Sequence, residues 1–150
     1  MNVARWVYVV LLVAMAGGQI LDFPAFRAIL REYDIVPAGA TAAMAVLLVA
    51  GEMFAAVALA RRSTAAAGAL IMLAVAIAWT ALGTQAFVRG LVLDNCGCFG
   101  KFFGQELRWW VLLQDAIWLV GAAYLAFGLS LRRRQRSRST GIGPQPVHSS

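Results

Sequence analysis

The sequence predicts an all-α membrane protein: a four-transmembrane-helix bundle with a short amphipathic surface helix in the first outer loop. Of the 150 residues, 61% are hydrophobic and only 13% are charged, and the mean hydropathy is +0.74. A water-soluble domain needs many more polar residues to cover its surface, so that class is excluded. The apolar residues form four blocks, each about long enough to cross a hydrocarbon core of about 30 Å as a helix.

One transmembrane domain, residues 1–131, contains all four predicted spans, which cover about residues 6–21, 38–60, 65–88 and 109–131. The first span has a second interpretation. Arg5, a short apolar core and the triplet Ala14-Met15-Ala16 also fit a signal peptide that is cleaved after residue 16. The third span opens with small residues, 65–69, which let helix backbones approach closely in lipid.

The first polar interruption, residues 22–37, predicts the short amphipathic helix. The apolar residues Phe26, Ile29, Leu30 and Tyr33 recur there at helical spacing, and charged residues lie between them. Pro24 and Pro37 bracket the segment as start and stop signals. This helix is either a connector at the membrane surface or a cover over the bundle.

The basic residues predict the orientation. The N-terminus, the turn at 61–62 and the tail hold eight of the thirteen, against five in the two longer interruptions. The positive-inside rule therefore predicts a multi-pass protein of the bacterial inner (cytoplasmic) membrane with both termini cytoplasmic. Residues 132–150 are predicted to be a basic, disordered cytoplasmic tail. Membrane orientation explains the net charge of +6, so the partner is the lipid bilayer and no nucleic acid is expected.

The second polar interruption, residues 89–108, holds the only two cysteines, Cys96 and Cys98, and is predicted to be periplasmic or extracellular. A disulfide between residues i and i+2 closes a small ring and is easily reduced. Cys96 and Cys98 are therefore the candidate catalytic residues of a thiol-disulfide oxidoreductase. Cations nearby, Arg89, Lys101 and Arg108, would stabilise a thiolate.

Three alternatives for the cysteines stay open. They form a structural disulfide in a non-enzymatic membrane assembly or scaffold factor, they remain a pair of unpaired thiols in a loop, or they hold a metal shared with a second chain. No metal is expected within one chain, because zinc usually needs four ligands and the only histidine, His148, lies in the tail.

Polar and aromatic residues near the outer span ends predict a pocket for a quinone head group. The candidates are Gln85, Trp109, Trp110 and Asp115. Interhelical hydrogen bonds and interfacial anchoring would explain the same residues. Glu52 lies deeper, as an intramembrane carboxylate with Tyr124 as its candidate partner. It is either a proton relay or a protonated link between helices.

The chain resembles the MauE-like membrane proteins of methylamine utilisation, which are related to the broader DoxX-like group. The matching features are Cys96-Gly97-Cys98-Phe99-Gly100 after Arg89-Gly90, three residues of the first interruption, and Glu52 in the second span. Those three residues are Phe26, Tyr33 and Pro37. The likeness covers roughly residues 6–127.

The resemblance implies a four-helix protein of amine metabolism. Such a protein supports maturation, or disulfide formation, of a periplasmic protein such as the disulfide-rich small subunit of methylamine dehydrogenase, with a thioredoxin-like partner. Carried over, Cys96 and Cys98 are the redox pair and Glu52 is the family's intramembrane carboxylate. Two sites depart from the family: Gln19, where members often carry lysine, and Gln114-Asp115, near which they carry an arginine-asparagine pair.

Overall fold

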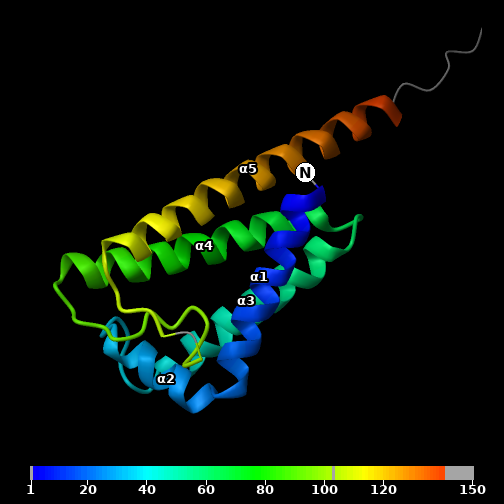
Figure 1. Ribbon diagram of the computed structural model, residues 1–150. Coiled ribbons are helices and arrows are strands. Elements are labelled where there is room, and N and C mark those ends of the chain that lie inside the picture. The colour runs from blue at the N-terminus through cyan, green and yellow to red at the C-terminus, as the bar shows by residue number, and fades with distance from the viewer. Residues whose placement is uncertain (1, 103, 141–150) are drawn as a thin grey trace, which may run out of the picture.

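The structure, a computed structural model, describes residues 2–102 and 104–140, and its regular elements there are all helices (Figure 1). They are α1 (Asn2–Leu21), α2 (Phe23–Glu32), α3 (Thr41–Ala60), α4 (Ala65–Val88) and α5 (Trp109–Thr140). All except α2 are long and apolar enough to cross a membrane. The predicted all-α bundle of four spans with one short additional helix is confirmed, and the chain is a multi-pass membrane protein.

Helices α3 and α4 lie in the middle of the bundle, because α4 packs on both α3 and α5, while α3 also packs on α1. Figure 1 shows α4 and α5 side by side, with α1 and α3 crossing beside them. The α3–α4 hairpin is tight at Gly68, where a Cβ would lie 2.7 Å from the carbonyl carbon of Ala58. The predicted close approach at the small residues 65–69 is therefore confirmed.

Helix α5 begins at the predicted Trp109 but continues past the predicted end at 131 to Thr140. Residues 132–140 are thus helical rather than disordered, because arginine and glutamine favour helix and this segment contains no glycine or proline. Residues 141–150, which include His148, lie outside the described residues, and disorder there stays a prediction. Helix α3 begins at Thr41 rather than at 38, after a turn in which Ala40 N donates to Pro37 O.

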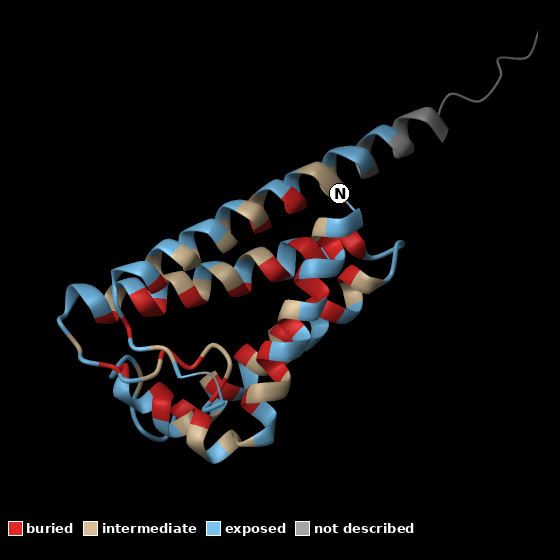
Figure 2. Cartoon of the chain, viewed as in Figure 1, coloured by how far each residue is buried: buried red, intermediate tan, exposed pale blue. Residues whose placement is uncertain are grey.

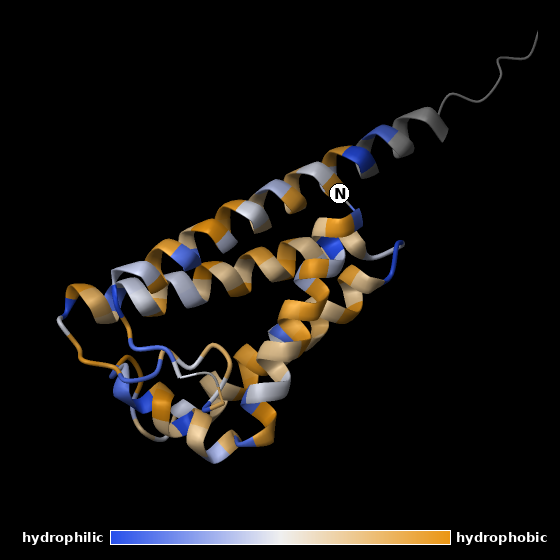
Figure 3. Ribbon diagram, in the orientation of Figure 1, coloured by the Kyte–Doolittle hydropathy of each residue, from blue (hydrophilic) through white to orange (hydrophobic). Residues whose placement is uncertain are grey.

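The outer surface of the spans is apolar. Exposed side chains there include Val10, Leu47, Phe54, Val120 and Phe127. Figure 2 shows the buried residues where the helices meet, and Figure 3 shows hydrophobic residues all along the spans. This pattern suits lipid, which solvates apolar side chains, rather than water.

The bundle has two ends with different chemistry. The cysteine end consists of α2 and the cysteine loop, residues 89–108. The arginine end consists of the start of α1, the turn 61–64 and the part of α5 near Arg132 (Figure 1). At the cysteine end, one hydrophobic core joins α2 to the cysteine loop through buried residues that include Phe26, Tyr33, Trp79 and Cys96. The predicted apolar face of α2 is therefore packed on the loop.

Candidate functional site

The two cysteines are brought together by the turn at Gly97. Their sulfur atoms lie 3.5 Å apart, and both are free thiols. Gly97 has φ 81°, in the left-handed region that favours glycine, and a Cβ there would lie 2.9 Å from Cγ2 of Ile29 in α2. At this separation one thiol can hydrogen-bond to the sulfur of the other.

The cysteine loop is also braced by its own residues. The Asn95 side chain accepts from Gly97 N at 2.9 Å and donates to Gly100 O at 2.9 Å. Gly100 N donates to Gly97 O at 2.9 Å, and Cys96 N donates to Gln105 O at 2.8 Å. Asn95 was not predicted as part of the site. Its position before a glycine turn is the signal, because asparagine commonly bonds backbone groups two residues on.

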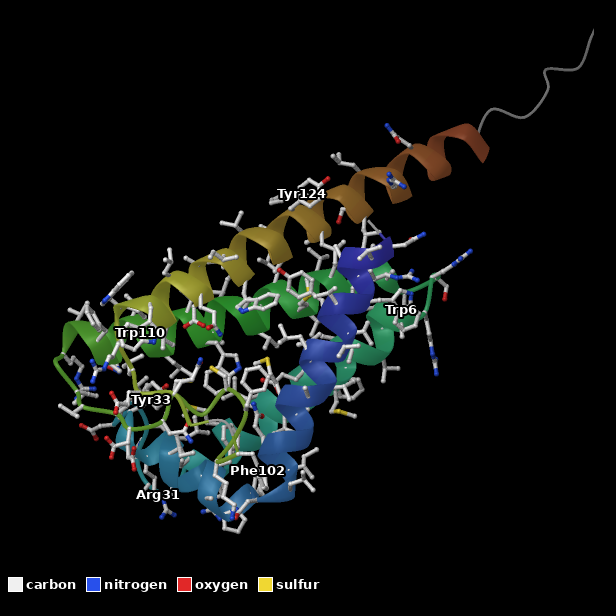
Figure 4. The ribbon with its side chains drawn as sticks, in the orientation of Figure 1. Trp6, Arg31, Tyr33, Phe102, Trp110 and Tyr124 are labelled. Atoms are coloured by element: carbon white, nitrogen blue, oxygen red, sulfur yellow. The ribbon has the colours of Figure 1, made fainter. Side chains whose placement is uncertain are left out.

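Two side chains from outside the loop hold the carbonyl groups of the cysteines. Tyr33, just after α2, donates its hydroxyl to Cys96 O at 2.7 Å, and Gln19 of α1 donates Nε2 to Cys98 O at 2.9 Å. Burial raises the pKa of Tyr33 well above its usual value, so its hydroxyl stays protonated and remains a donor. Figure 4 shows Tyr33 beside the cysteine loop. The backbone at both cysteines is therefore fixed from two directions.

The cysteine loop contacts α1 at Gly18, where no side chain fits. A Cβ on Gly18 would lie 2.9 Å from the carbonyl carbon of Phe99, and a Cβ on Gly100 would lie 2.7 Å from the carbonyl carbon of Gly18. Gly17, one position earlier, has nothing within 4 Å of its Cβ position. Only the second glycine of the pair is therefore required by the loop.

We expect Gly18→Ala to loosen the loop. Overpacking of this kind costs about 1–3 kcal/mol, which makes undocking of the loop about 5-fold to 150-fold more frequent. The rate at which a maleimide alkylates Cys96 and Cys98, followed by mass spectrometry, measures this change. Gly17→Ala is the matched control and should leave the rate unchanged. Equal rates in the two variants would contradict the contact between the loop and Gly18.

The intramembrane carboxylate Glu52 is connected to the cysteine loop. It is fully buried, and its Oε1 accepts from Trp79 Nε1 at 2.9 Å and from Gln19 Nε2 at 3.1 Å. The same Gln19 amide donates to Cys98 O, so one side chain joins the carboxylate to the loop. Glu52 Oε2 is buried without a partner among the described residues.

The prediction that Tyr124 is the partner of Glu52 is wrong. The Tyr124 side chain is 69% exposed and lies on the outer face of α5 in Figure 4. The physical reason is that α5 packs on α4 and not on α3, so equal depth in the membrane does not bring the two residues together. The residues that do meet Glu52, Gln19 and Trp79, were not predicted for this role. A tryptophan within a uniformly apolar span gives no signal of the face it occupies.

The four predicted quinone-pocket residues do not lie together. Asp115 lines a cavity of about 60 Å³ between α1, α4 and α5, and Cys98 lines the same cavity. Gln85 lies outside this lining and donates to Tyr33 O at 3.3 Å. Trp109 and Trp110 are also outside it, exposed and in edge-to-face contact with each other.

This cavity does not fit a quinone. Pockets for small molecules usually measure about 300–1,000 Å³, whereas a cavity of about 60 Å³ holds a few water molecules. What the cavity offers is polar groups beside a thiol, because Gln114, Asp115 and Thr80 line it with Cys98.

The two thiols are electrostatically unequal. The hydrogen bond with Cys98 lowers the pKa of Cys96. The same hydrogen bond, together with burial and the nearby Asp115, raises the pKa of Cys98 well above its usual value. Cys96 is therefore the residue that more readily becomes a thiolate.

The cations expected to stabilise a thiolate are paired with carboxylates instead. Arg89 pairs with Asp34 at 3.0 Å, Arg108 pairs with Glu106 at 2.7 Å, and Lys101 pairs with Asp22. The bond to Lys101 lowers the pKa of Asp22, which also caps the start of α2 by accepting from Ala25 N. The pairs of Arg89 and Lys101 tie the cysteine loop to the residues that flank α2, whereas the Arg108–Glu106 pair lies within the loop. The Cys98 thiol remains the support for a Cys96 thiolate.

Comparisons with known proteins add one finding. A family model described as "Methylamine utilisation protein MauE" matches residues 1–128, which include the first three apolar spans, most of the fourth, α2 and the cysteine loop. No curated protein and no solved structure is found to match the chain.

Proposed function

The chain belongs to the MauE family of methylamine utilisation proteins, and on that premise we propose that it is a membrane thiol-disulfide redox protein. It supports maturation of an extracytoplasmic protein of methylamine metabolism, such as the small subunit of methylamine dehydrogenase. The observation that carries this function is the pair of free thiols at Cys96 and Cys98, whose sulfur atoms lie 3.5 Å apart on a backbone held at both carbonyls.

The reaction is exchange with a disulfide of a thioredoxin-like partner. The Cys96 thiolate attacks one partner sulfur, and the other partner sulfur leaves as a thiolate and takes up a proton. Cys98 then loses its proton, attacks Cys96 and releases the second partner thiol. Two electrons pass to the partner, whose two sulfur atoms take up protons from water, and a Cys96–Cys98 disulfide remains. In the reverse direction the same steps oxidise a client dithiol.

The asymmetry of the thiols supports this order of attack. The lower pKa of Cys96 suits the attacking sulfur, and the raised pKa of Cys98 keeps its proton until the second step. The proton of Cys98 has an exit, because water in the adjoining cavity can carry it toward Asp115.

Helix α2 supports control of access to the pair. Cys96 is only 3% exposed and lies in the same hydrophobic core as Phe26, Ile29 and Tyr33. A soluble partner reaches its sulfur only when α2 or the loop moves aside, so α2 acts as a cover rather than as a plain connector. The distribution of basic residues supports an extracytoplasmic position for this end, with both termini in the cytoplasm.

Trapping of the mixed disulfide tests the exchange. In a Cys98→Ser variant the second step cannot occur, so a partner attacked by Cys96 stays covalently attached and is identified by mass spectrometry after non-reducing electrophoresis. The Cys96→Ser variant is the matched control, and we expect it to capture at least about tenfold less, because the thiolate-forming residue is gone. If neither variant captures a partner, the exchange mechanism is contradicted.

A further inference from the structure

A second cavity lies at the arginine end, far along the bundle from the thiols. Its volume is about 450 Å³, within the usual range of ligand pockets. Three separate parts of the chain line it: the start of α1, the α3–α4 turn and α5. Each contributes one arginine, namely Arg5, Arg62 and Arg132.

The three arginines have no carboxylate among them. The described lining contains no aspartate or glutamate, and the ion pairs of the described residues use Arg89, Lys101 and Arg108 at the cysteine end. Like charges repel, and the repulsion is stronger where protein excludes part of the water. A bound anion would convert this repulsion into attraction.

Arg5 is the buried arginine of this cavity. Its side chain is buried, with the residue only 8% exposed, and its Nε has no hydrogen-bond partner among the described residues. A buried unpaired donor on a charged group is costly unless a ligand accepts from it. The Arg5 guanidinium also lies 5.6 Å from the ring centroid of Trp6. The planar guanidinium fits the geometry of phosphate, to which it donates through two parallel N–H groups.

The position of the cavity along the spans indicates where the anion comes from. Arg5 lies in the first turns of α1, and Arg132 ends the apolar stretch of α5. The arginines therefore lie at the depth of lipid head groups, while Ala65 and Leu129 add apolar surface to the same lining. We propose that this cavity binds the phosphate of an anionic phospholipid, independently of the thiol chemistry at the other end.

Native mass spectrometry of the purified full-length chain in detergent tests the site. The delipidated protein is titrated with phosphatidylglycerol, with phosphatidylcholine, and with inorganic phosphate. We expect phosphatidylglycerol to bind at least about tenfold more tightly than phosphatidylcholine. Arg62→Gln and Arg132→Gln should each weaken its binding about fivefold, which corresponds to about 1 kcal/mol.

Arg61→Gln is the matched control. Arg61 is exposed, adjacent in sequence and outside the cavity lining, so its loss should change the affinity less than twofold. Equal losses for Arg61→Gln and Arg62→Gln would overturn the site in favour of general surface charge. Equal binding of the two lipids would overturn it as well, and inorganic phosphate that displaces phosphatidylglycerol at equal concentration would show a site for the free ion. The Arg62 and Arg132 side chains are exposed, so these variants are expected to fold.

Discussion

Replacement of both Cys96 and Cys98 by alanine is expected to reduce maturation of the client protein to the level of cells that lack the chain. Thiol-disulfide exchange requires a nucleophilic sulfur and a resolving sulfur, and the described residues offer no other cysteine. The yield of active methylamine dehydrogenase and the redox state of its small subunit, followed by alkylation and gel shift, measure this loss.

The control for this variant is Asp94→Ala, which changes an exposed residue of the same loop and should leave the yield unchanged. The competing hypothesis is a non-enzymatic scaffold with a structural disulfide. It requires that the pair stays fully oxidised in cells. Full client maturation by the double alanine variant would establish the scaffold and end the redox proposal.

Glu52→Ala is expected to lower the free energy of unfolding by about 2–4 kcal/mol. The substitution leaves the buried donors Trp79 Nε1 and Gln19 Nε2 without their shared acceptor, and it opens a cavity between α1, α3 and α4. Thermal unfolding of the detergent-solubilised protein measures the change. Glu32→Ala removes an exposed carboxylate from α2 and should stay within about 0.5 kcal/mol of the unmodified chain. If Glu52→Ala changed the free energy of unfolding as little as Glu32→Ala, the role of Glu52 as the shared acceptor would be contradicted.

Glu52→Gln separates the two roles predicted for this carboxylate. Glutamine keeps a carbonyl oxygen that accepts from Trp79, so most of the stability should return. Retained exchange activity in this variant identifies a structural acceptor. Lost activity at full stability identifies a proton relay, because an amide cannot carry a proton between sites.

The bundle could be predicted from the sequence because each span is a long apolar block between polar segments. The structure reproduces the third predicted span, 65–88, at both ends. The rotation of each span about its own axis could not be predicted. The faces of α3 and α4 are almost uniformly apolar, so no periodicity shows that Glu52 and Trp79 face one another. Depth alone suggested Tyr124 instead.

The chemistry of the site could be predicted from the sequence, but the contacts that hold the cysteine loop in place could not. Two cysteines around a glycine are visible in the sequence, and the apolar spacing of Phe26, Ile29 and Tyr33 indicates a packed helix. The contact of that helix with the cysteines depends on the tertiary fold. Gly17 and Gly18 look equivalent in the sequence, yet only Gly18 touches the loop. The helical extension to Thr140 was missed because the end of the apolar stretch marks where α5 leaves the lipid, not where the helix stops.

The anchored carbonyls of Cys96 and Cys98 have a consequence for the speed of the second exchange step. Because Tyr33 and Gln19 fix the backbone on both sides of Gly97, the attack of Cys98 on a mixed disulfide at Cys96 requires side-chain rotation and little movement of the main chain. The effective concentration of one sulfur at the other is therefore high, and the loss of conformational entropy that would slow ring closure in a flexible peptide has already occurred during folding. For the proposed exchange we therefore expect fast release of the partner and a short-lived mixed disulfide in the unmodified protein.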